Sequence, residues 1–109
     1  MVRIIKRSAS VTAALYGEID HCSAHKMRET IEEAIADPSV KELRLDFSHV
    51  TFMDSSGVGM LIGRYRTMAN REGRIVAFGL NAQMERLFRF AGLHRIIKLE
   101  EADKEAVNE

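Results

Sequence analysis

The sequence is poor in the features that mark several large classes of protein. Its 109 residues include one cysteine, Cys22, and one proline, and 16 basic residues balance 16 acidic ones. A lone cysteine excludes an internal disulfide framework and is typical of a reducing compartment. The formal net charge is zero, so the chain has no excess of basic residues to bind the phosphate backbone of a nucleic acid. A general role in binding nucleic acid is therefore not expected.

Long apolar segments are missing as well. The longest apolar stretch runs from Gly57 to Gly63 and ends at Arg64, far short of the ~20 residues that a membrane-spanning helix needs. The first seven residues contain no apolar run long enough for a secretory signal. With 46% hydrophobic and 29% charged residues, the composition predicts a globular cytoplasmic protein, not bound to a membrane, in which residues 1–109 form one domain.

What is present is a hydrophobic pattern that alternates between strand and helix. Strands over 2–5 and 11–16 are expected to form a hairpin across Ser8–Ser10, with Gly17 ending the second strand. Next are expected a loop over 18–22, a helix over 24–35 capped by Ser23, a strand over 43–48 and a connection over 49–54. The rest of the chain is expected to form a helix that Gly73 follows, a strand over 75–78 and a helix between Asn81 and Gly92. A strand over 96–99 and a helix in the acidic tail 100–109 are expected last.

This order predicts an α/β fold with a mixed β-sheet, in which the N-terminal hairpin is antiparallel and the later strands are parallel. Helices that join parallel neighbours make right-handed crossovers. About four helices are expected to flank the sheet. In the second of them, the apolar residues that recur at helical spacing are Val58, Leu61, Ile62, Tyr65 and Ala69.

The most distinctive segment is Phe52–Gly59, which connects a buried strand to an amphipathic helix. Such connections gather at the carboxyl ends of parallel strands, where ligands and partners bind. Aspartate and serine are preferred helix starters, so capping explains part of the segment. Capping does not explain Gly57, Gly59 and Gly63, because glycine inside a helix costs roughly 0.5–1 kcal/mol relative to alanine. We therefore expect that other groups, from this chain or from a binding partner, approach this helix closely at its glycines.

This segment does not match three common motifs of enzymes and nucleotide-binding proteins. A P-loop needs a Gly-Lys pair, and the chain has none. In the dinucleotide-binding pattern G-x-G-x-x-G, Gly63 comes one position late. A hydrolase elbow needs glycine two residues before the serine, where Met53 precedes Ser55. Neither an enzymatic activity nor a cofactor is therefore expected.

A metal site is the other chemistry that short motifs suggest. His21 and His25 are four residues apart, the spacing of two ligands on one helix face, and Cys22 lies beside them. No second cluster supplies the missing ligands, and a helix that starts near Ser23 breaks the face. The sequence therefore predicts no metal site.

Ser55 suits a different role, as the substrate of another enzyme. A phosphate on Ser55 would carry about −1.5 to −2 charges and would meet free N–H groups at the positive end of the helix. The fold can accept that charge, whereas a partner that covers the hydroxyl with acidic or apolar groups cannot. The segment therefore predicts a binding surface that phosphorylation switches off.

Six segments spread over nearly the whole chain carry a resemblance to a known family: Gly17–His21, Phe52–Gly57, Gly63–Arg66, Arg86–Phe88, Ala91–Leu93 and Ile96–Ile97. In this order they resemble STAS domains, and among them the anti-sigma F factor antagonists of spore-forming bacteria.

The resemblance implies a regulator of sporulation-specific transcription, monomeric when free. In that family the unphosphorylated protein binds a kinase anti-sigma factor, which uses ATP, and thereby releases the sigma factor. The kinase phosphorylates the serine after the motif's aspartate, here Ser55; this ends binding, and a serine phosphatase reverses it. The partner-binding residues that the resemblance implies are Glu18, Asp20, His21, Asp54, Ser55, Ser56, Gly57 and Gly59.

Three other functions remain open. The chain could antagonise a stress-response anti-sigma factor, although the Gly63–Arg66 and Arg86–Phe88 segments favour the sporulation branch. It could be a STAS subunit of a transporter, which co-purification with membrane proteins would reveal. A small nucleotide-binding protein is the weakest alternative, since the Gly-Lys pair is missing, and titration with ATP and GTP would test it.

Overall fold

The computed structural model describes residues 1–101. Of the acidic tail 100–109, where a helix was expected, residues 102–109 therefore lie outside the described residues. The elements in chain order are β1 (Val2–Arg7), β2 (Ser10–Ile19), α1 (His21–Ala34), β3 (Glu42–Met53), α2 (Ser55–Asn70), β4 (Arg74–Phe78), α3 (Ala82–Phe90), the 3₁₀ turn η1 (Leu93–Arg95) and β5 (Lys98–Glu100).

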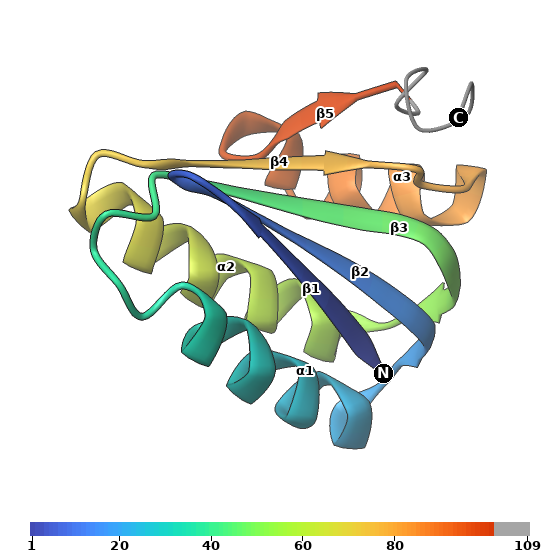
Figure 1. Ribbon diagram of the computed structural model, residues 1–109. Coiled ribbons are helices and arrows are strands. Elements are labelled where there is room, and N and C mark those ends of the chain that lie inside the picture. The colour runs from blue at the N-terminus through green and yellow to red at the C-terminus, as the bar shows by residue number, and fades with distance from the viewer. Residues whose placement is uncertain (102–109) are drawn as a thin grey trace.

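The five strands form one mixed sheet in the order β1-β2-β3-β4-β5. The β1–β2 pair is antiparallel and every later pair is parallel, which confirms the predicted α/β class. Because the strands follow one another in sequence order, right-handed crossovers bring their helices to the same face of the sheet. Figure 1 shows α1 and α2 lying side by side against that face. Of the expected four helices, α1, α2 and α3 lie in the described part.

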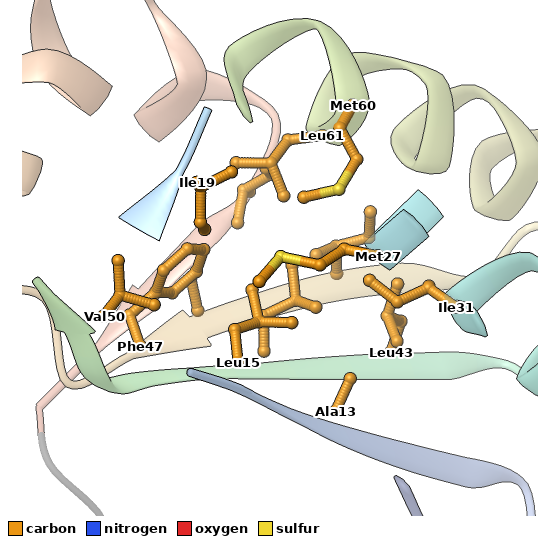
Figure 2. Packing of buried hydrophobic residues seen from close by; sticks show 14 of the residues in the cluster. Ala13, Leu15, Ile19, Met27, Ile31, Leu43, Phe47, Val50, Met60 and Leu61 are labelled. Atoms are coloured by element: carbon orange, nitrogen blue, oxygen red, sulfur yellow. The ribbon is translucent and has the colours of Figure 1, made fainter. Parts of the chain in front are cut away.

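The core fills the space between the sheet and the helices. Leu15 of β2 and Leu43 of β3 point toward Met27 and Ile31 of α1 (Figure 2), and all four are buried. Near α3, the rings of Phe47 and Phe88 meet edge to face, with centroids 5.6 Å apart. Phe47 shares its side of β3 with Leu43, so α3 covers the same face of the sheet as α1 and α2.

Two strands are longer than the sequence analysis predicted. Residues 49–53 belong to β3, not to a connection, and β2 continues through Gly17 to Ile19. The register of these two strands shifts twice, between Ala14 and Tyr16 and between Gly17 and Glu18. These bulges break the alternation of buried and exposed residues, so that β3 is buried at Phe47, Val50 and Met53. Buried residues three apart do not match the period of two that is typical of a strand, so residues 49–53 were not predicted to be part of one.

The first two helices also differ in detail from the expectation. Helix α1 begins at His21 with Asp20 as its N-cap, so Ser23 lies in the first turn and 18–22 is not a loop. In α2 the buried stripe consists of Gly57, Met60, Leu61, Arg64 and Met68. Of the apolar residues predicted for that stripe, only Leu61 is buried, and Ala69 is exposed.

The end of α2 is built differently from the predicted glycine cap. Glu72, not Gly73, takes the left-handed conformation, with φ at 58°. The N–H groups of Glu72 and Gly73 donate to the carbonyls of Ala69 and Met68, at 3.0 and 2.7 Å, as in a Schellman motif. Gly73 is needed for space instead, since a Cβ there would lie 2.7 Å from the carbonyl oxygen of Lys41.

Alanine at Gly73 and at Gly63 is expected to change stability in opposite directions. Gly73→Ala should lower the free energy of unfolding by about 1–3 kcal/mol, because the new methyl group meets a backbone oxygen. Gly63→Ala should raise it by roughly 0.5–1 kcal/mol, because the position lies inside a helix and a Cβ there meets nothing within 4 Å. Urea unfolding of the two variants measures both changes; a loss of stability in both would contradict the explanation.

Candidate functional site

Two helices begin side by side at the carboxyl edge of the sheet. Strands β2 and β3 are paired up to Ile19 and Met53, and an aspartate follows each of these residues. The N–H of Asp54 donates to the carbonyl of Ile19 at 3.1 Å, which extends the ladder by one bond. Asp20 caps α1 and Asp54 caps α2. The two helix starts are therefore held in register by the backbone of the sheet.

Asp20 forms a capping box with Ser23. Its carboxylate accepts the backbone N–H of Ser23 at 2.9 Å, and the Ser23 hydroxyl accepts the backbone N–H of Asp20 at 2.9 Å. The same hydroxyl donates to the carbonyl of Glu18 at 2.7 Å. The hydrogen bond from the Ser23 N–H, followed by the side-chain bond to Ser23, lowers the pKa of Asp20. Asp20 thus has a structural role that its assignment to a docking surface does not include.

Asp54 leaves Ser55 free at the start of α2. Its carboxylate accepts the backbone N–H of Ser56 at 2.8 Å. Ser55, the first residue of the helix, is exposed, whereas Ser56 is half-buried. Within residues 1–101, neither serine hydroxyl makes a hydrogen bond. A carboxylate that caps the backbone is not positioned to activate Ser55, so the geometry favours Ser55 as a substrate over Ser55 as a nucleophile.

The glycines of α2 have two different roles. Gly57 is buried, and a Cβ there would lie 2.6 Å from Sδ of Met53 and 3.0 Å from Cγ2 of Ile19. The close approach at Gly57 is therefore an internal one, between the helix and the ends of β2 and β3. At Gly59 and Gly63 a Cβ would meet nothing within 4 Å. These two positions leave open space above the helix.

Two other predicted site residues lie on the surface at the same edge of the sheet. Glu18 and His21 are exposed, at the end of β2 and the start of α1. Phe52, which was not among the predicted site residues, pairs with Glu18 across the two strands and is 43% exposed. An exposed aromatic ring is a common anchor in protein interfaces. The position of Phe52 in the distinctive segment pointed to it as a candidate. That its ring is exposed, however, depends on the bulges between the two strands.

Comparison with known proteins identifies this arrangement. The family model described as the STAS domain matches residues 3–106. The chain belongs to the STAS domain family.

Relatives of this STAS domain carry the names of anti-sigma factor antagonists. The anti-sigma-B factor antagonist of Listeria monocytogenes is 37% identical over 82% of this chain and 77% of its own length. The anti-sigma F factor antagonist of Paenibacillus polymyxa is 30% identical over 87% of this chain and 81% of its own.

Solved structures of SpoIIAA agree with the fold. The unphosphorylated form aligns with a TM-score of 0.78 at 28% identity, covering 98% of this chain and 94% of that one. The phosphorylated form, from Bacillus, aligns with a TM-score of 0.76 at 29% identity, covering 99% and 97%. The predicted resemblance to this family is confirmed, whereas the relatives include both the sigma-B and the sigma-F branches.

Neither a membrane span nor a metal cluster is found within residues 1–101. No helix there is both long and apolar enough to span a bilayer. No three side chains of histidine, cysteine, aspartate or glutamate come together as metal ligands. His21 and His25 do lie one turn apart on α1, because the helix begins earlier than predicted. His25, however, contacts Glu29 through Nε2 at 2.8 Å.

Proposed function

We propose that this STAS domain is an anti-sigma factor antagonist that binds a kinase anti-sigma factor until Ser55 is phosphorylated. The observation that carries the proposal is the exposed hydroxyl of Ser55 at the first position of α2, beside a neighbour whose carboxylate is occupied by the cap. The exposed side chains of Glu18, His21 and Phe52 lie at the same edge of the sheet, near the ends of β2 and β3 and at the start of α1. The names of the relatives support the same function.

The surface suits a switch based on charge. A phosphate on Ser55 would lie near the positive end of α2, which favours it by about 0.3–1 kcal/mol. Asp54 next to it opposes the new charge by a comparable amount, so the free domain should change little in stability. A partner surface that covered a neutral hydroxyl has no such compensation, because an unpaired charge buried at an interface is costly.

Ser55, not Ser56, is expected to accept the phosphate. Ser55 is exposed, whereas Ser56 is half-buried and its backbone N–H is held by Asp54. Incubation with candidate kinase anti-sigma factors and ATP should add one phosphate to the wild type and to Ser56→Ala, but none to Ser55→Ala. Intact-mass analysis measures this, and a serine phosphatase should remove the added mass. Phosphorylation of Ser55→Ala, with its loss in Ser56→Ala, would reverse the assignment.

Glu18 and Asp20 are expected to form an acidic docking edge for the kinase. Because Asp20 caps α1, a lysine there would disturb the helix as well as the charge. Asp20→Asn removes the charge and keeps a good cap, and Glu18→Lys changes an exposed residue. Both should slow association several-fold at low salt and weaken its salt dependence.

The control for this edge is Glu33→Lys, at an exposed position near the other end of α1. It makes the same change of charge as Glu18→Lys, but far from Ser55. Association rates from stopped-flow or surface plasmon resonance measure the effect. If Glu18→Lys and Asp20→Asn associate at the wild-type rate at low salt, the docking edge does not exist.

The sigma factor branch is a separate part of the proposal. The sequence motifs favour regulation of sporulation-specific transcription, whereas the 37% identity to an anti-sigma-B factor antagonist favours a stress-response pathway. Pull-down with purified kinases of the two branches separates these functions. Retention of the sporulation kinase alone supports the first, and retention of the stress-response kinase alone supports the second.

A further inference from the structure

A groove between α1 and α2 is lined by basic side chains. Its volume is about 350 Å³, and its polar lining consists of His21, His25 and Arg28 from α1 with Ser56 and Arg64 from α2. Its lining includes no acidic side chain. The volume falls in the range of roughly 300–1,000 Å³ that is usual for small-molecule sites. The two open glycines, Gly59 and Gly63, lie along its α2 wall.

Arg64 is a buried cation with unused hydrogen-bond donors. Its side chain is 8% exposed, and only Nη2 has a partner, Oε1 of Glu32 at 2.7 Å. Within residues 1–101, its Nε and Nη1 atoms are buried and make no hydrogen bond. Buried polar groups are nearly always hydrogen-bonded, and a buried charge without partners is costly. Within the described residues, Nε and Nη1 of Arg64 thus lack an acceptor, and Arg64 is one of the residues that line the groove.

The charges around Arg64 also favour an added anion. Burial lowers the pKa of Arg64 and the positive charge of Arg28 lowers it further, while Glu32 raises it. Arg28 contacts Nδ1 of His25 through Nη2 at 3.3 Å, and Glu29 pairs with the other ring nitrogen of His25. Arg28 and Arg64 both line the groove, and the charge of Arg28 is one of the causes that lower the pKa of Arg64. An anion between them would replace repulsion by attraction.

We propose that this groove binds a phosphate group, held by Arg28 and Arg64 with the Ser56 hydroxyl beside them. Arginine suits phosphate because its planar guanidinium presents several donors at once. Alanine or any larger residue at Gly59 or Gly63 would occupy the open space above α2. The same phosphate chemistry can come from inorganic phosphate or from a small phosphate ester, and the volume of the groove leaves room for the ester. The groove shares His21, Ser56 and Gly59 with the proposed partner surface, so binding of phosphate is tested on the domain alone.

The test uses the purified 109-residue protein without a partner. Inorganic phosphate and glycerol 3-phosphate are each titrated against sodium chloride of equal ionic strength, with thermal unfolding and ¹⁵N amide shifts as readouts. The expected result is a saturable rise in melting temperature, with shifts centred on Ser56, Gly59 and Gly63. Binding of the ester at least tenfold tighter identifies a metabolite as the source, and equal binding identifies inorganic phosphate.

Variants separate a built site from general screening of charge. Arg28→Gln, at an exposed position, should weaken phosphate binding at least tenfold and keep the fold. Arg64→Met should abolish binding, and it is a suitable second variant because replacing a buried ion-paired residue by an apolar one is often tolerated. Arg86→Gln, exposed on α3, is the control and should bind like the wild type. A phosphate effect that chloride reproduces, or that Arg28→Gln retains in full, overturns the proposal.

Discussion

Replacing Ser55 with aspartate is expected to lower the affinity for the anti-sigma factor at least a hundredfold while the domain stays folded. A hundredfold loss corresponds to about 2.7 kcal/mol, which is within the cost of an unpaired charge buried at an interface. The free domain loses little, because Ser55 is exposed and its hydroxyl makes no hydrogen bond within residues 1–101. Isothermal titration of the variant against the kinase anti-sigma factor measures the loss.

The matched control is Ser39→Asp, at an exposed serine in the connection before β3. It adds the same charge at the opposite end of β3, so its affinity should equal that of the wild type. Thermal unfolding of Ser55→Asp should remain one cooperative transition close to the wild-type temperature. Loss of that transition, in the variant or in the phosphoprotein, would show that the switch acts by unfolding and not by local charge.

Phe88→Ala is expected to cause the largest loss of stability of the substitutions considered. Phe88 is fully buried on α3 and packs edge to face against Phe47 of the central strand. Truncating a buried phenylalanine to alanine costs about 3–5 kcal/mol, because transfer energy is lost and a cavity remains. That is a large share of the 5–15 kcal/mol that stabilises a typical domain. Equilibrium unfolding in urea measures the change.

The same helix provides the control for this prediction. Phe90 lies two residues further along α3 and is 92% exposed. Phe90→Ala makes the same chemical change without emptying the core, so its effect should stay within about 0.5 kcal/mol. Comparable losses in the two variants would mean that α3 is stabilised by something other than its contact with Phe47.

Sequence patterns predicted the order of the elements and failed where the backbone departs from a regular period. The strand expected over 43–48 and the helix expected over 24–35 were found close to those positions, because each keeps one regular hydrophobic period there. The second half of β3 was missed, because two bulges move its buried residues to a spacing of three. Bulges depend on the pairing of two strands and leave no separate signal in either one.

The candidate site was predicted in part for a similar reason. Ser55 and Asp54 could be located because helix starts have a local signature. Arg64 could not be placed, since an arginine in a helix is normally read as part of its solvated face. Its burial follows from the packing of α1 against α2 and from its ion pair with Glu32. Contacts between two helices are invisible to a pattern that describes one helix at a time.

Two kinds of residue lie at the edge of the sheet where the N–H of Asp54 donates to the carbonyl of Ile19. The residues that hold the edge are the two aspartate caps and the paired strand ends, and they act through the main chain or within the core. The residues that face outward are Glu18, Phe52 and Ser55, and they contribute little to the stability of the fold. Exchanging the outward set is therefore expected to change the surface that a partner would meet while the contacts that hold the edge stay in place. One scaffold of this kind can thus carry different sets of outward residues.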